Sequence, residues 1–282
     1  SGRGADLTPY WYKGERNIHS AILSGTYQFN QALTAVVGVR YDNVFQNMTY
    51  NTNMSNSEVD GPSRIEKDYL LPSLNLKYAL NEKSNLRASA SMSYTLPQFI
   101  ETAYFKNTFS TGSVIGNKDL VPVENLNFDL KWELFPDQCE LISVGAFYKQ
   151  LKNPIARVES SNNVMTFFNV GSSAQVAGAE IEFKKNLLTT TNEYGDNILS
   201  VGANVSYLYS TQKLQNEKAI FTAFNGTSKL QGASPLLANA DVSYLLNAIK
   251  LKWTSSLVFN YFSDRVFAIG TNGFRNVSEK SV

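Results

Sequence analysis

The stretch LNFDLKWEL, residues 126–134, alternates apolar and polar side chains without interruption. Successive side chains of an extended strand point to opposite faces, so the stretch predicts a two-faced strand. One face carries Asn127, Asp129, Lys131 and Glu133, and the other carries Leu126, Phe128, Leu130, Trp132 and Leu134. In a soluble protein the apolar face meets a core, whereas in a transmembrane barrel it meets lipid and the polar face lines a hydrated lumen.

Composition narrows the choice between these two environments. The chain has 282 residues, of which 43% are apolar, 12% aromatic and 17% charged, with a net charge of +1. This balance is typical of an ordered protein, and without a basic tract it gives no indication of nucleic-acid binding. No run approaches the roughly 18 apolar residues of a spanning helix. A helical membrane protein is therefore excluded, but a β-barrel is not, because alternate residues of a barrel strand are polar.

The same alternation recurs along the chain. Clear copies lie at 71–80, 86–95, 126–134, 141–149, 177–184, 200–209 and 236–244, and weaker ones at 18–29, 33–45 and 251–263. In 86–95 the apolar face runs from Leu86 to Tyr94. Many of these segments approach the roughly 9–11 residues that a tilted strand needs to cross a bilayer. The pattern predicts about ten strands.

The connections between these strands alternate in length. Short joints at 30–33, 81–84, 136–138, 188–196 and 247–249 alternate with long ones at 46–64, 97–123, 154–173 and 213–233. Outer-membrane barrels have tight periplasmic turns and long extracellular loops, whereas a soluble sandwich has no reason to alternate. Aromatic residues also stand near the short joints, as in an interfacial girdle: Phe29, Tyr78, Phe135, Phe183 and Tyr244.

These patterns together predict an all-β fold, an antiparallel transmembrane up-and-down β-barrel segment. In this interpretation the carboxylates and lysine of LNFDLKWEL point inward, and the row that contains Trp132 faces lipid. A soluble β-fold is the alternative.

Four segments, in order, resemble TonB-dependent outer-membrane receptors. GNKDLVPVENLNFDLKWELFP (116–136) resembles their GNPxLxPExSxNxDLxxEW segment, and LLPSLNLKYALNEKSNLRASASMSYTLPQFIE (70–101) resembles the preceding hairpin. FNVGSSAQVAGAEIEFKKNL (168–187) resembles the family's N...A...GxExE strand, and LQGASPLLANADVSY (230–244) its LxGQSPxxxNxxLxY segment. The resemblance covers most of the chain from about residue 17.

The resemblance implies a location in the cell outer membrane and a barrel of about 22 strands, of which this chain supplies part. Residues 1–282 are expected to belong to one barrel domain, with the family's plug domain and final strands absent from it. The expected partners are outer-membrane lipid, the TonB complex through the absent plug region, an extracellular ligand and, as a candidate, a surface lipoprotein.

Enzymatic interpretations find little support in the sequence. A single histidine, His19, excludes two-histidine metal sites, and Cys139 near a turn is more typical of a small strand-start residue than of a nucleophile. GSVIGNK (112–118) lacks the GxxxxGK[ST] spacing of a phosphate loop. STQK (210–213) has no SDN or KTG partner. We therefore expect no enzyme, no catalytic or metal site and no cofactor.

The long connections are the expected place for ligand contacts, because loops on a rigid scaffold carry recognition. Aromatic side chains beside amides suit a sizeable polar ligand with apolar faces, such as a siderophore, glycan, peptide or cobalamin. The candidate residues are Tyr104, Phe105, Phe109, Asn117 and Asp119 in one connection, and Arg157, Asn162, Asn163, Phe167 and Phe168 in another. The alternative is that these aromatic residues pack the loops together.

Two functions follow from these expectations. The first is a TonB-dependent receptor that takes up a scarce nutrient through recognition by its extracellular loops. The second is a β-protein without transport activity, either an adhesin-like barrel or a soluble carbohydrate-binding sheet.

Overall fold

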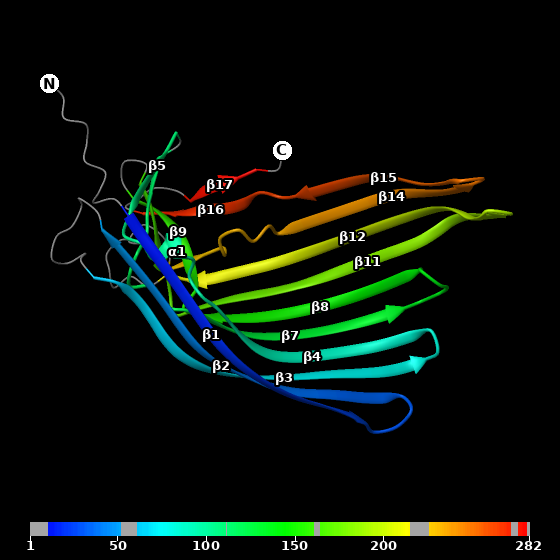
Figure 1. Cartoon of the computed structure of the whole chain (residues 1–282), viewed down its shortest axis with the longest axis horizontal. Helices are drawn as coiled ribbons and strands as arrows, with labels where there is room; N and C mark the ends of the chain where they lie inside the picture. Colours follow the sequence, from blue (N-terminus) through cyan, green and yellow to red (C-terminus); the bar gives the residue numbers. More distant parts are fainter. Residues whose placement is uncertain are drawn as a thin grey trace.

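Most of the chain forms one large antiparallel sheet (Figure 1). The computed structural model describes residues 11–51, 61–110, 112–160, 164–214, 226–271 and 276–280. The strands follow one another in the order β1 (Trp11–Gln28), β2 (Leu33–Asn51), β3 (Ser63–Asn81), β4 (Ser84–Thr95), β7 (Val123–Leu134), β8 (Leu141–Lys152), β11 (Ser173–Asn192), β12 (Gly195–Lys213), β14 (Leu236–Ala248) and β15 (Leu251–Phe262). β13 (Thr227–Ser228) pairs with β12 beside this path. The expected meander of about ten strands is confirmed.

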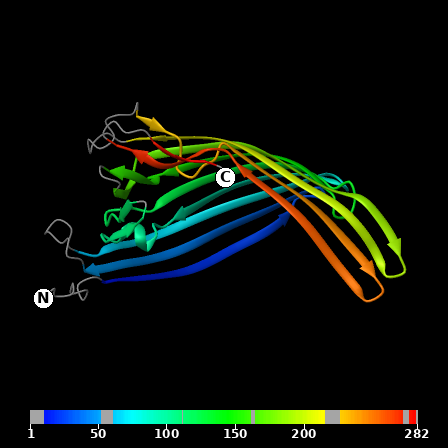
Figure 2. The ribbon, with the colours of Figure 1, turned by 90° about the horizontal axis from the view of Figure 1, so that it is seen from above.

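The sheet is a curved shell whose two ends differ (Figure 2). The turns that join β1 to β2, β3 to β4, β7 to β8, β11 to β12 and β14 to β15 gather at one end (Figure 1). The segments between β4 and β7 and between β8 and β11 lie at the other end, which we call the outer end. Among the described strands β1 and β15 are the edges, and the sheet does not close.

Two expected connections are shorter than the sequence indicated. Residues 46–51 belong to β2 and pair with β1 as far as Trp11. Most of 188–196 belongs to β11 and β12, with Glu193 and Tyr194 left as the turn. These two boundaries were wrong because backbone pairing continues beyond the point where the apolar alternation fades. Phe183 consequently lies within β11, away from the turn.

The polar face of LNFDLKWEL joins a ladder of side-chain contacts across neighbouring strands. Arg87 Nε lies 2.7 Å from a Glu133 carboxylate oxygen, and Lys131 Nζ lies 3.5 Å from one of Glu182. Ser89 donates to Asp129 over 3.2 Å. On the opposite face, Phe128 and Leu130 are 43% and 51% exposed. Charged groups are therefore partnered on one face, while large apolar side chains lie open on the other.

The long connections cover the outer end of the polar face. In β2 this face continues through Asp42, Val44, Gln46 and Met48, which alternate along the strand on the same side as Ser73 of β3. Each of the four β2 residues is at most 2% exposed. Gln46 donates its amide to the main-chain oxygen of Pro97 over 3.1 Å, so the segment after β4 lies over this face. The arrangement favours the expected inward direction of the polar face.

Tyr94 departs from the expected alternation. The pattern places it with the apolar row of β4, yet its hydroxyl donates to buried Asp42 over 2.8 Å. Its ring also stacks on Tyr69, with centroids 4.0 Å apart. Pairing between β3 and β4 stops at Ser73 and Ser91, so the end of β4 separates from β3. Tyr94 therefore contacts Asp42 of β2 and Tyr69 of β3 and does not lie with the apolar row of β4.

A second sheet at the outer end was not expected from the sequence. Its strands run in the order β17 (Val277–Glu279), β16 (Arg265–Gly270), β9 (Ile155–Ser160), β10 (Val164–Asn169), β6 (Gly112–Ile115) and β5 (Lys106–Phe109). The buried cluster beside it comprises Ala156, Val158, Val170, Leu214, Val266 and Ile269. We call these six strands the outer sheet.

One helical turn, α1 (Phe99–Thr102), precedes the outer sheet. Arg16 of β1 donates to Pro97 O over 3.0 Å and lies over the Phe99 ring, 5.1 Å from its centroid. A Cβ at Gly14 would lie 2.8 Å from the same ring, so any larger residue would have to displace the ring. The wall thus anchors the segment that leads into the outer sheet. No helix within the described ranges is both long and apolar enough to cross a membrane.

The two faces of β7 predict opposite responses to a change in charge. Leu130→Arg places a charge on the exposed apolar row and should cost about 2–4 kcal/mol of stability if that row faces the bilayer midplane. Lys131→Gln removes a partly exposed ion pair and should cost less than about 1 kcal/mol. Refolding of the full-length receptor into lipid vesicles, titrated with urea, measures both. Equal losses for the two variants would contradict the assignment of the faces.

Candidate functional site

The outer sheet brings together connections that are distant in the sequence. β6 pairs in parallel with β10, and β9 pairs in parallel with β16. The strands come from the segments after β4, after β8 and after β15. Candidate residues from the first two segments therefore share one surface at the outer end.

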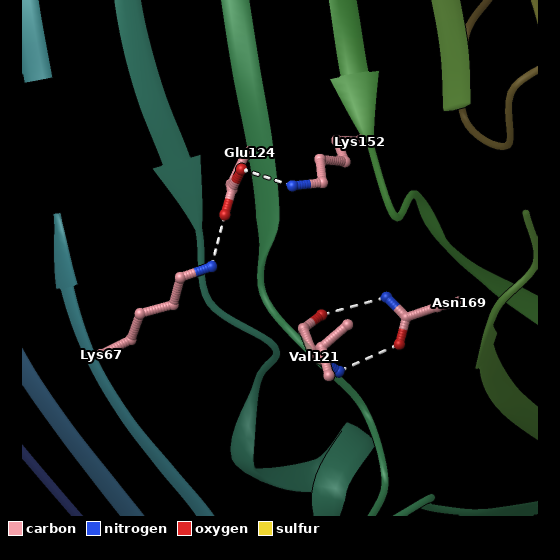
Figure 3. A network of polar contacts seen from close by, with 5 residues as sticks. All are labelled: Lys67, Val121, Glu124, Lys152 and Asn169. Atoms are coloured by element: carbon pink, nitrogen blue, oxygen red, sulfur yellow. Dashed lines mark hydrogen bonds and ion pairs between the residues drawn. The ribbon is translucent and has the colours of Figure 1, made fainter. Parts of the chain in front are cut away.

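Asn169 fastens two of these segments to each other (Figure 3). Its side-chain oxygen accepts the Val121 N–H at 2.9 Å, and its side-chain nitrogen donates to Val121 O at 3.0 Å. The same nitrogen lies 2.8 Å from Asn153 O. One amide therefore links the main chain of the segment before β7 to the main chain of the segment after β8.

Glu124 ties the adjoining wall strands together (Figure 3). Its carboxylate pairs with Lys67 of β3 and, at 3.3 Å, with Lys152 of β8. All three side chains keep some contact with solvent, so each pair contributes little to stability alone. Their combined effect is to tie the start of β7 to β3 and β8, where the chain enters the wall after β6.

Asn117 and Gly116 hold the segment after β6 tightly against the neighbouring main chain. Asn117 donates its side-chain amide to Phe167 O over 2.9 Å, and its side-chain oxygen accepts the Asp119 N–H at 3.0 Å. A Cβ on Gly116 would lie 2.1 Å from Ala103 O, which only glycine avoids. Asn117 thus has a structural role, and ligand contact by Asn117 or exposed Asp119 stays a prediction.

A cavity of about 340 Å³ opens beside the outer sheet. It is lined by Phe109, Gly112, Ser113, Val114, Arg157, Met165 and Phe267. The Arg157 guanidinium carbon lies 4.5 Å from the Phe267 ring centroid and 5.8 Å from that of Phe167. Two expected ligand residues, Phe109 and Arg157, therefore meet at one cavity, and a third, buried Phe167, supports Arg157.

The remaining candidates lie apart from this cavity or outside the described residues. Phe105 packs edge-to-face against Tyr12, with centroids 5.8 Å apart, and half-buried Tyr104 precedes it. Phe168 packs against the buried cluster of the outer sheet, as the packing alternative predicted. Asn162 and Asn163 lie outside the described residues.

Sequence reasoning missed Phe267 and Met165. Phe267 belongs to β16, whose parallel pairing with β9 joins residues more than a hundred positions apart in the chain. Met165 shares a face with Phe167 and Arg157 through the pairing of β9 with β10. The stretch 164–169, VMTFFN, is mostly apolar without alternating, so the sequence indicated neither a face nor a partner for this strand.

Arg157 is the one charged residue that lines the cavity among the described residues. The charge of Arg157 acts on Glu101 of α1: burial raises the pKa of Glu101, while its bond to the Gln98 N–H and the charge of Arg157 act in the opposite direction. The Glu101 carboxylate accepts that N–H at 2.8 Å and is thus committed to the helical turn. Within the described part of the chain, no three histidine, cysteine or acidic side chains cluster as a metal site.

Asn169→Ala should loosen the outer sheet and leave the wall intact. The change removes three hydrogen bonds, and leaving their main-chain partners unsatisfied should lower local stability by about 1–3 kcal/mol. Hydrogen exchange of the full-length receptor, read by mass spectrometry, should speed up at 117–123, 153–160 and 164–169. Asn17→Ala is the control, because the Asn17 amide reaches the exposed Glu15 carboxylate of its own strand. Unchanged exchange in Asn169→Ala would refute the role of this amide.

Comparison with solved structures shows the same fold in larger proteins. The ferric yersiniabactin uptake receptor FyuA from Yersinia pestis is 13% identical, with a TM-score of 0.60, and the alignment covers 96% of this chain and 37% of that one. The copper transporter OprC is 14% identical, with a TM-score of 0.61 and coverage of 89% and 35%. The alcaligin outer-membrane receptor FauA from Bordetella pertussis is 14% identical, with a TM-score of 0.55 and coverage of 89% and 38%.

The chain spans 35% to 38% of the lengths of these three proteins. No curated protein matches the sequence significantly. The family model described as TonB dependent receptor-like, beta-barrel matches residues 1–280. The chain therefore belongs to the family of TonB-dependent receptor-like β-barrels of the outer membrane.

Proposed function

We propose that this chain forms part of the wall and outer recognition surface of a TonB-dependent receptor that takes up a scarce nutrient. The observation that carries the proposal is the meeting of Phe109 and Arg157 at one cavity. These residues come from two different long connections, and both connections lie at the end opposite the short turns (Figure 1). Binding residues commonly lie on loops that a rigid scaffold positions.

The nutrient is a small molecule, peptide or glycan in this proposal. Solved neighbours are named for ferric yersiniabactin, alcaligin and copper, so metal-carrying small molecules are the first class to test. The cavity of about 340 Å³ is near the lower end of ligand pockets, which span roughly 300–1,000 Å³. It suits one part of a larger ligand.

The proposal assigns the barrel wall and ligand recognition to this chain, and energy coupling to another part of the receptor. Residues 1–282 contribute to the barrel domain, and energy coupling belongs to a plug region outside them that contacts the TonB complex. A surface lipoprotein is a further candidate partner at the outer sheet. The soluble β-sheet alternative is wrong, because the family is an outer-membrane barrel.

Recognition at the cell surface requires the outer sheet to face the medium. In the full-length receptor with Cys139→Ser, a cysteine at Ser110 and another at Glu193 mark the two ends, and both positions are exposed turns. A membrane-impermeant maleimide added to intact cells should label Ser110→Cys and leave Glu193→Cys unlabelled until the cells are broken. The reverse pattern would invert the topology and contradict recognition by this sheet.

A further inference from the structure

We infer that Arg157 is the anion-binding residue of the outer cavity, and that the group it takes is a carboxylate carried on a flat apolar body. The inference rests on the proposed function for its biological meaning. Its physical basis is the absence of an ion pair at Arg157 among the described residues and the mostly apolar lining of the cavity.

The guanidinium of Arg157 forms no ion pair within the described part of the chain, although its charge acts on Glu101, whose carboxylate accepts the Gln98 N–H. The ion pairs found there use Arg40, Arg64, Arg87, Arg265 and three lysines, all at other places. The Arg157 Nε is buried and meets no acceptor among the described residues. A buried donor without an acceptor is costly, so the guanidinium keeps hydrogen-bonding capacity that the protein does not use.

Arg157 is held in place by a main-chain hydrogen bond, by strand pairing and by two aromatic rings. Its main-chain N–H donates to the side-chain oxygen of Gln231, and its strand pairs with β10, where Phe167 lies opposite. The rings of Phe167 and Phe267 attract the guanidinium as a cation over aromatic faces. The side chain is therefore pre-positioned, which lowers the entropy lost when a ligand binds.

The remaining walls determine what else the ligand carries. Phe109, Val114, Met165 and Phe267 supply apolar surface, and Ser113 supplies one hydroxyl. Arginine matches the two oxygens of a carboxylate through parallel N–H donors. A carboxylate on an aromatic or similarly flat body thus satisfies both the cation and the apolar walls.

Arg64 offers a matched control at the same end of the molecule. It also lies over an aromatic ring, 5.4 Å from the Phe45 centroid. Unlike Arg157, it is 58% exposed and forms an ion pair with Glu66. If the inference is correct, Arg64 should not contribute to anion binding, because its charge is already partnered.

Calorimetry on the full-length receptor in lipid nanodiscs tests the inference. The probes are naphthalene carboxylate and the matching neutral carboxamide. Arg157→Gln should weaken carboxylate binding at least about tenfold, leave carboxamide binding unchanged, and differ from Arg64→Gln, which should bind like the unmodified receptor. Equal affinity of the two probes for the unmodified receptor, or unchanged carboxylate affinity in Arg157→Gln, would overturn the inference.

A second measurement needs no variant and so does not depend on the folding of Arg157→Gln. Phenylglyoxal modifies arginine, and mass spectrometry reports the extent at each site. At equal concentration, naphthalene carboxylate should protect Arg157 more strongly than the carboxamide does, and neither probe should protect Arg64; equal protection of Arg157 by the two probes would refute the inference. Because neither experiment uses energy coupling or membrane sidedness, failure here leaves the surface-labelling test intact, and an inverted topology leaves the binding result intact.

Discussion

Backbone pairing between neighbouring strands is the constraint on which the rest of this structure depends. Lipid offers no hydrogen-bond partners to the peptide N–H and C=O groups, so a strand in a membrane must pair on both sides. Pairing in turn fixes the side-chain period at two, which separates the exposed row of Phe128 and Leu130 from the partnered row of Asp129 and Lys131. The polar ladder across β4, β7, β8 and β11 follows from this separation.

The wall could be predicted from the sequence because this constraint acts locally and repeats. In LNFDLKWEL the alternation of apolar and polar residues is visible within the stretch itself, and the same holds for the other strands of the large sheet. The ends of β2 and β11 were wrong, because beyond the membrane zone pairing continues without an apolar row to mark it. Tyr94 was assigned to the wrong row for a related reason: the pattern cannot show that β4 leaves β3 at Ser91.

The outer sheet could not be predicted, since its strands are short and its partners distant. β5 and β6 have four residues each, which is too few to establish a period. β9 pairs in parallel with β16, which is distant in the sequence. The candidate residues Phe109 and Arg157 were predicted from residue type and loop position alone. Their meeting at one cavity depends on Asn169 and Arg16, whose hydrogen bonds tie the long connections to each other and to the wall. The position of the proposed recognition surface thus rests on polar contacts that no periodicity reveals.

The central claim is that the apolar row of β7 faces lipid and the polar row faces the lumen. A nitroxide scan through residues 126–134 of the full-length receptor in lipid vesicles tests it most directly, because molecular oxygen collects in lipid and a water-soluble nickel chelate does not. Labels at Phe128, Leu130 and Trp132 should be more accessible to oxygen, and labels at Asp129, Lys131 and Glu133 more accessible to nickel. The opposite phase, or no alternation along the strand, would contradict the claim.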